Sequence, residues 1–88
     1  MSWSKLKQDY VDEYLRTHPC VDCGETDVRV LEFDHIDRES KTDNIGRCIR
    51  SMGMKNLIEE IDKCVVRCAN HHSIRHFNER RLKEEDDD

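Results

Sequence analysis

Apolar residues recur every three or four positions through the first part of the chain, between residues 3 and 16. The members of this stripe are Trp3, Leu6, Tyr10, Val11, Tyr14 and Leu15. This spacing is typical of one buried face of a helix, so we expect an amino-terminal helix over residues 3–16. Ser2 or Ser4 could cap its start, and Pro19 ends it because a proline disfavours helical backbone in the preceding residue.

The pattern changes to that of a strand over residues 28–36. This segment is rich in apolar and β-branched residues, and Leu31 and Phe33 alternate with Glu32. Such alternation is typical of a strand with one buried face. The segment is the clearest strand of the chain.

This strand runs directly into Asp34 and His35. A carboxylate beside an imidazole at the end of a strand is common in metal-assisted catalysis. Residues 37–53 are polar and irregular. Within them we expect a short return strand at residues 41–45, which would complete a hairpin.

Helical spacing returns over residues 54–64. Leu57, Ile61 and Cys64 fall on one face, which indicates that Cys64 is a core residue rather than a metal ligand. Cys48 has no ligand partner at a useful spacing, and we interpret it as a small apolar filler. The acidic residues of this helix, Glu59, Glu60 and Asp62, are expected to face water.

A last helix is predicted from about Asn70 or His71 to about Lys83. Ile74 and Phe77 would form its inner face. The acidic residues after Lys83 are expected to fray and to stay solvated.

The composition fits one small domain with a thin core. Of 88 residues, 35% are hydrophobic and 40% are charged, and domains of this size commonly need a metal or disulfides. The chain shows neither a secretory signal nor a segment of membrane-spanning length. Its five cysteines, an odd number, indicate a reducing compartment in which paired cysteines bind metal. We therefore expect a cytoplasmic protein with no membrane partner.

Two residue pairs have the spacing of a zinc knuckle. Cys20 and Cys23 are separated by two residues and followed by a glycine, which lets backbone amides approach the sulfur atoms. Cys68 and His71 have the spacing of the second half of a knuckle, and Cys64 is an alternative fourth ligand. A redox motif would need a helix at the first cysteine and a βαβ setting, and neither is visible. The pattern therefore predicts structural zinc.

The net charge of −5 argues at first against a nucleic-acid partner. The acidic tail at residues 84–88 accounts for all of this charge. Between Arg67 and Lys83 basic residues outnumber acidic ones, and bound cations would add positive charge. DNA binding is thus compatible with the charge distribution but is not demanded by it.

Three segments together resemble the HNH endonucleases, also called ββα-metal nucleases. The segments are the cysteine pair at 20–23, Leu31-Glu-Phe-Asp-His-Ile36 and Lys63-Cys-Val-Val-Arg-Cys-Ala-Asn-His-His72. The likeness is closest to small stand-alone members encoded by bacteriophages and bacteria, and it covers residues 20 to about 78.

The resemblance implies an α+β fold, a small zinc-stabilised ββα-metal domain with an additional amino-terminal helix. The chain would form a single domain of residues 1–88. Its parts would be the helix in residues 1–19, the zinc-bound core in 20–83 and the acidic tail in 84–88.

The resemblance also implies a role for each matched residue. His35 matches the general base, and an unperturbed imidazole can accept a proton at neutral pH; the alternative is a hydrogen-bonded structural histidine. Asp34 and His72 would hold one catalytic divalent cation, Mg²⁺, Mn²⁺ or Ni²⁺. His76, one helical turn beyond His72, is either a third ligand or a solvated residue. The structural zinc would be bound by Cys20, Cys23, Cys68 and His71, with Cys64 as the alternative to His71.

The middle asparagine of the signature and the phosphate-binding residues are matched less closely by this sequence. Lys63 stands where the middle asparagine of the signature is expected, and Asn44 or Asn56 could replace that asparagine. Flanking phosphates would be bound by Arg75, Arg80 and Arg81, although the same basic face could serve solubility alone.

The leading hypothesis is a metal-dependent DNA endonuclease that cuts or nicks the duplex, in a bacterial cytoplasm or that of a phage-infected host. It could act within a larger phage or bacterial DNA-processing complex. The alternative is a non-catalytic zinc-binding module that binds DNA or a protein on the same scaffold, and a thiol redox protein is the third class. Asp34, His35 and His72 separate the first two hypotheses, because a purely structural zinc domain does not need all three.

Overall fold

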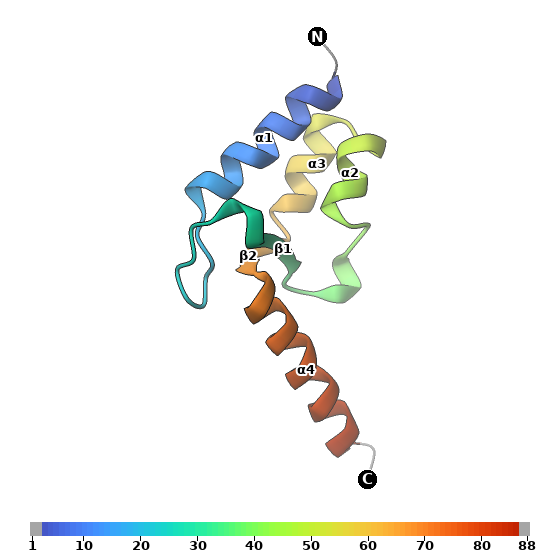
Figure 1. Cartoon of the computed structure of the whole chain (residues 1–88). Helices are drawn as coiled ribbons and strands as arrows, with labels where there is room; N and C mark the ends of the chain where they lie inside the picture. The colour runs from blue at the N-terminus through green and yellow to red at the C-terminus, as the bar shows by residue number, and fades with distance from the viewer. Residues whose placement is uncertain (1–2, 87–88) are drawn as a thin grey trace.

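A two-stranded sheet lies between three packed helices at one end of the molecule and a single projecting helix at the other (Figure 1). The computed structural model describes residues 3–86. In chain order its elements are α1 (Trp3–Thr17), the 3₁₀ turn η1 (Val28–Val30), β1 (Leu31–His35), the 3₁₀ turn η2 (Arg38–Ser40), α2 (Ile45–Ser51), α3 (Met54–Ile61), β2 (Cys64–Cys68) and α4 (Ala69–Asp86). The fold is therefore of the predicted α+β class.

Helix α1 forms where the apolar stripe predicted it and ends at Thr17. Val11 is buried on its inner face. The imidazole of His18 stacks on the ring of Tyr14, and its Nδ1 donates to the Tyr14 carbonyl at 2.8 Å. The Thr17 hydroxyl donates to the same carbonyl at 3.1 Å, so two side chains bond to the carbonyl end of the helix. Ser2, one of the two predicted caps, lies outside the described residues.

The predicted return strand at residues 41–45 is wrong, because the partner of β1 is the later segment β2. The two strands pair antiparallel, with Leu31 opposite Cys68 and His35 opposite Cys64. Side chains of β2 alternate between buried and half-buried, as expected for a strand that covers a core. The hairpin that the sequence suggested is thus replaced by a pairing between distant segments.

Two predicted elements are shorter than expected. The helix predicted over residues 54–64 stops at Ile61, because the β-branched residues 65–66 belong to β2. The strand predicted from residue 28 begins only at Leu31. Before it, the Asp27 side chain accepts a hydrogen bond from a backbone amide and caps the turn η1.

Helix α2 was not predicted from the sequence. It has seven residues, of which Ile45 and Cys48 are buried. So short a helix, with two buried positions, produces little periodic signal. Cys48 is fully enclosed, which confirms that it serves as an apolar filler.

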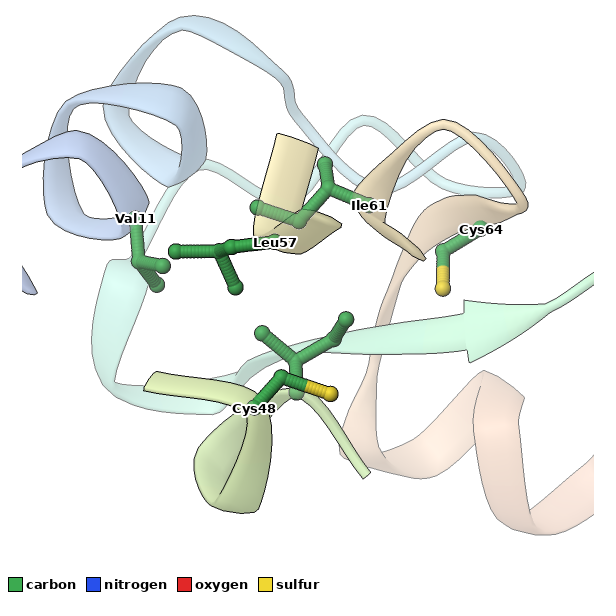
Figure 2. Close-up of a cluster of buried hydrophobic side chains, with 6 residues drawn as sticks. Val11, Cys48, Leu57, Ile61 and Cys64 are labelled. Carbon is green, nitrogen blue, oxygen red and sulfur yellow. The ribbon is translucent and has the colours of Figure 1, made fainter. Parts of the chain in front are cut away.

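The main core lies between α1, α2 and α3. Leu57, Ile61 and Cys48 are its most buried side chains, and Figure 2 shows them with Val11 and Cys64. Cys64 therefore lies in the core, as its spacing predicted. A smaller core at the sheet is formed by Cys20, Leu31, Val66 and Cys68.

Helix α4 leaves the sheet and projects away from the rest of the molecule (Figure 1). The prediction that Ile74 and Phe77 form its inner face is wrong, since each is 52% exposed. Polar side chains contact the sheet instead, through the first turns of the helix. The helix continues to Asp86, so residues 84–86 are helical rather than frayed, and residues 87–88 lie outside the described part. Within residues 3–86 no helix is long and apolar enough to span a membrane.

Candidate functional site

Three cysteine sulfurs and one histidine nitrogen meet where the start of α4 faces the turn at residues 20–24. The ligand atoms of Cys20, Cys23, Cys68 and His71 all lie within 4.8 Å of one another. The sulfur atoms of Cys23 and Cys68 are 3.8 Å apart, and Cys68 Sγ is 3.2 Å from His71 Nδ1. A tetrahedral zinc ion with Zn–S bonds of about 2.3 Å places sulfur atoms about 3.8 Å apart. These residues, the knuckle cluster, could therefore hold a metal such as zinc.

The turn that carries Cys20 and Cys23 presents backbone amides to the Cys20 sulfur. Gly24 adopts a φ of +78°, and its amide donates to the Cys20 carbonyl at 2.9 Å, which closes the turn. Burial alone would raise the pKa of Cys20, but hydrogen bonds from backbone amides, that of Cys68 foremost, lower this pKa to about 6. A lowered pKa favours the thiolate that metal binding needs.

Cys64, the alternative fourth ligand, belongs to a different part of the molecule. Its side chain lies in the main core, and its Sγ is 3.5 Å from the Glu60 carbonyl oxygen. Burial, with the negative charges of Glu60 and Asp34, raises the pKa of Cys64 to about 12, which disfavours its thiolate. The structure thus brings His71, and not Cys64, into the knuckle cluster.

A second group of ligand atoms joins the end of β1 to the first turns of α4. Asp34, His72 and His76 each offer one ligand atom within 4.8 Å of the others. The two histidines share one face of α4, with ring centroids 4.6 Å apart. Asp34 approaches from the strand, and its Oδ1 lies 3.6 Å from His72 Nε2. The three residues predicted to hold a catalytic cation therefore lie together, and we call them the cleft cluster.

The buried carboxylate of Asp34 lies between two guanidinium groups. Arg67 Nη1 is 2.8 Å from Asp34 Oδ2, and Arg75 Nη1 is 2.8 Å from Asp34 Oδ1. Burial would raise the pKa of Asp34, but hydrogen bonds from Arg75 and Arg67 hold this pKa below its usual value. Arg67 also pairs with Asp22 in the knuckle turn at 2.7 Å. One arginine therefore links the two clusters.

Glu32, a second carboxylate on β1, orients one of the histidines. Its Oε1 lies 2.8 Å from His72 Nδ1, and His72 Nε2 faces Asp34. A carboxylate on one ring nitrogen fixes the tautomer and leaves the other nitrogen available as a metal ligand. Glu32 was not among the predicted site residues. It precedes Asp34 by two positions and so shares its face of the strand, a signal the sequence does contain.

The cleft cluster borders a cleft of about 640 Å³. Two cations that the sequence pattern did not single out, Arg38 and Lys41, line this cleft. Arg38 reaches α4, where its Nη2 lies 2.6 Å from His76 Nδ1 and 3.3 Å from Glu79 Oε2. Burial and the positive charge of Arg38 lower the pKa of His76, which favours the neutral imidazole that binds metal.

His35 lies on the opposite face of β1 from Asp34, because side chains alternate along a strand. It is 7% exposed, and its Nε2 lies 2.8 Å from Glu60 Oε2. His35 nevertheless lines the same cleft. Among residues 4–82 every fully buried side-chain nitrogen has a hydrogen-bond partner. His35 Nδ1 has none in that part of the chain and is therefore not sealed from solvent.

Glu60 was predicted to face water, and this prediction is wrong. The residue is only 2% exposed, because its carboxylate turns inward to His35 and to Lys63. The periodicity of α3 placed Glu60 beside the core, and these partners, which lie on other segments, keep its charge there.

Neither asparagine proposed for the middle of the signature is hydrogen-bonded to His35, although Asn44 lines the same cleft. In the part of the chain that the structure describes, the side chains of Asn44 and Asn56 make no hydrogen bond to residues 34–42. The loop after β1 is held instead by Lys63, whose Nζ donates to a carbonyl of that loop at 2.7 Å.

The three arginines predicted to bind phosphate have different surroundings. Arg75 is engaged inside the protein, where it contacts Asp34 and, at 2.9 Å, Glu79. Arg80 lines two shallow grooves beside the cleft. Arg81 lies over the ring of Phe77, 5.6 Å from its centroid.

The chain matches no family model, no curated protein and no solved structure. Its function therefore has to be argued from the site: the types of the ligand residues, their distances, and the cleft that they border.

Proposed function

We propose that the protein is a metal-dependent endonuclease that hydrolyses DNA phosphodiester bonds, as its resemblance to the HNH family implies. The observation that carries this proposal is the convergence of Asp34, His72 and His76 within 4.8 Å beside a cleft. A carboxylate and two imidazoles form an oxygen and nitrogen ligand set for a divalent cation. His35 lines the same cleft, so a candidate base and a candidate cation site border one space.

The proposed nuclease unit consists of β1, β2 and the first turns of α4, which would form the ββα-metal fold. Its support is the antiparallel pairing of the two strands and the direct passage from β2 into α4. The chain departs from a simple hairpin because residues 36–63, with α2 and α3, separate the strands. Those helices supply most of the apolar core.

Zinc in the knuckle cluster would have a structural role. The cluster provides four protein ligands, and a fully protein-ligated tetrahedral site is typical of structural zinc. It would join the turn at residues 20–24 to the junction of β2 and α4. His72 follows His71 directly, so this zinc would also position the start of the helix that carries the cleft cluster.

His35 is the general base in this proposal. With Nε2 turned to Glu60, its Nδ1 would take the proton of the attacking water. Asp34, His72 and His76 would hold the catalytic cation, which when bound stabilises charge on the phosphate and on the departing oxygen.

The ligand types of the cleft cluster favour Mn²⁺ or Ni²⁺ over Mg²⁺. Mg²⁺ prefers oxygen ligands and keeps several waters, whereas imidazole suits later first-row metals. Two of the three ligands of the cluster are imidazoles. Activity is therefore expected to be higher with Mn²⁺ or Ni²⁺ than with Mg²⁺.

The DNA backbone would be bound by cations around the cleft, namely Arg38, Lys41 and Arg80. Arg75 would contribute indirectly, by holding Asp34. Because the whole chain carries a charge of −5, this local group has to overcome an unfavourable overall field. Weak affinity of the isolated protein would suit a component of a larger phage or bacterial DNA-processing complex.

Incubation of zinc-loaded protein with supercoiled plasmid and Mg²⁺, Mn²⁺ or Ni²⁺ tests the proposal. Nicked or linear DNA is expected with at least one cation and not in mild EDTA. His35→Ala should lower the rate by roughly 10²–10⁴-fold, the usual contribution of a general base. His35→Gln keeps a donor toward Glu60 and serves if His35→Ala does not fold. His18→Ala removes an imidazole from the end of α1 and is the matched control.

A second candidate function is a non-catalytic zinc module that binds DNA or a protein. One observation favours it: the Asp34 carboxylate already bonds to Arg67 and Arg75, and both guanidinium groups would compete with a cation. Absence of cleavage by folded, zinc-loaded protein with all three cations would favour this candidate. Binding of a labelled duplex without cleavage would then identify DNA as its ligand.

A further inference from the structure

The buried carboxylate of Glu60 receives donors from three segments of the chain. Its Oε2 accepts from the Thr42 amide at 3.0 Å and lies 2.8 Å from His35 Nε2. Its Oε1 accepts from Lys63 Nζ at 3.0 Å. These partners lie at the end of β1, in the loop before α2, and in the residue before β2.

The donors determine the protonation of the pair. Burial would raise the pKa of Glu60, but hydrogen bonds from the Thr42 amide, Lys63 and His35 lower this pKa to about 2. An ionised carboxylate can only accept hydrogen bonds, so His35 Nε2 carries the hydrogen between them. In a neutral imidazole the lone pair then lies on Nδ1, the nitrogen that is not sealed from solvent.

Lys63 balances the charge of Glu60 and forms hydrogen bonds to the segment that follows His35. Its Nζ also donates to the Ser40 carbonyl at 2.7 Å. Its own carbonyl accepts from the Ile36 amide, directly after His35, at 2.9 Å. Because Lys63 neutralises Glu60, His35 need not be protonated to pair with that carboxylate.

We propose that Glu60 is a positioning residue for His35, holding the ring with Nε2–H inward and Nδ1 toward the cleft. The inference rests on the proposed nuclease function, which makes His35 the base. It assigns to Glu60, with Lys63, the bracing that the middle asparagine of the signature would supply. Burying a carboxylate costs more free energy than burying an apolar side chain at the same place in a core. A role for the negative charge of Glu60 in orienting His35 would account for this cost.

The first test does not depend on activity. In zinc-loaded protein with isotope-labelled histidine, the Nε2–H proton of His35 should give a slowly exchanging resonance shifted downfield by a charge-assisted hydrogen bond. Glu60→Ala should lose this resonance. Glu59→Gln, a change at the exposed neighbouring glutamate of α3, should keep it. Absence of the resonance in the wild type, or its survival in Glu60→Ala, would overturn the proposal.

The second test is plasmid cleavage in Mn²⁺. Glu60→Ala should lower kcat by roughly 10–100-fold, with the KM for DNA nearly unchanged, and Glu59→Gln should change neither. Glu60→Gln keeps the side-chain shape without the charge, and it replaces Glu60→Ala if that variant does not fold, with a smaller loss in the same direction.

The outcomes separate this inference from the proposed function. A folded, zinc-loaded variant at Glu60 that melts earlier but keeps the full kcat would indicate a purely structural role and overturn the inference. A wild-type protein that shows the Nε2–H resonance but does not cleave DNA would overturn the nuclease while supporting the orientation of His35 by Glu60.

Discussion

The two ligand clusters lie side by side at the start of α4, yet they differ in chemistry and in surroundings. Two consecutive residues belong to different clusters: His71 to the knuckle cluster and His72 to the cleft cluster. The knuckle cluster is mostly sulfur, and Cys20 and Cys68 are buried. The cleft cluster is a carboxylate with two half-buried imidazoles beside open space.

This difference shows how one helix start can serve two purposes. Neighbouring residues on a helix point about 100° apart, so His71 and His72 face different partners. Soft thiolates in a closed site hold zinc tightly, whereas a carboxylate with imidazoles beside a cleft makes a weaker, exchangeable site. Arg67 bonds to Asp22, in the turn that carries Cys20 and Cys23, and to Asp34 of the cleft cluster. Loss of the knuckle metal should therefore disturb the cleft, while loss of the cleft metal should leave the knuckle intact.

The largest effect is expected from removing the metal of the knuckle cluster. Protein purified without chelator should hold one zinc per chain, and complete removal should abolish the cooperative thermal transition. Structural zinc contributes roughly 10–16 kcal/mol of apparent binding free energy, comparable to the whole stability of a domain. Calorimetry with metal analysis checks this, and Cys48→Ala is a control that should keep zinc. An unchanged cooperative transition without zinc would contradict the knuckle.

The next effect contrasts the two adjacent histidines. His71→Ala should lose zinc and much of the folded structure. His72→Ala should keep both but bind Mn²⁺ more weakly by at least roughly 10–100-fold, the loss seen when even an outer partner of a ligand is removed. Zinc analysis and a Mn²⁺ titration of each variant measure the split. Zinc retained in His71→Ala and lost in Cys64→Ala would instead place four cysteines around the metal.

The buried carboxylate of Glu60, which bonds to His35 at the cleft, should make the stability of the protein depend on pH. The pKa of Glu60 falls from 4.5 to about 2 on folding. Its stabilisation is therefore complete above the unfolded pKa and is lost as the pH drops from about 5 toward 2. At neutral pH, Glu60→Gln should cost about 2–4 kcal/mol.

Urea unfolding of wild type and Glu60→Gln in excess zinc measures this difference at each pH. The difference in the free energy of unfolding between wild type and Glu60→Gln should become smaller below about pH 5. The difference between wild type and Glu59→Gln should not change with pH in this way. A difference that stays constant into the acid range would count against an ionised, paired Glu60.

A smaller effect is expected at Cys64, which lies beside the knuckle in sequence but in the core in space. Cys64→Ala should cost about 1–2 kcal/mol, because it leaves a small cavity. Zinc content should not change, since the residue is outside the knuckle cluster. Chemical denaturation with metal analysis checks both expectations.

The smallest effect concerns the cations around the cleft. Arg38→Ala should reduce the slope of log affinity against log salt for duplex DNA by about 0.9, the value for one phosphate contact. Arg16→Ala, on the exposed face of α1, is the matched control and should leave the slope unchanged. Equal slopes for both variants would show that the cleft is not the DNA-binding surface.

The ligands of both clusters could be predicted from the sequence because their spacing is local. Two residues between Cys20 and Cys23 define a turn, and a four-residue step puts His72 and His76 on one face of a helix. Asp34 could be predicted because it ends a strand of clear alternation. That these residues carry out nuclease chemistry stays a prediction.

The pairing of β1 with β2 and the burial of Glu60 beside His35 could not be predicted, because both depend on contacts between distant segments. Residues 64–68 continue the apolar spacing of α3, and they form a strand because β1 pairs with them. Glu60, as a charged residue of α3, was expected to be solvated, and its burial depends on donors from His35, Thr42 and Lys63. Local spacing determines which side chains can share a turn or a face, since backbone geometry repeats. Which faces meet, and which charge is buried between them, depends on the packing free energy of the whole chain.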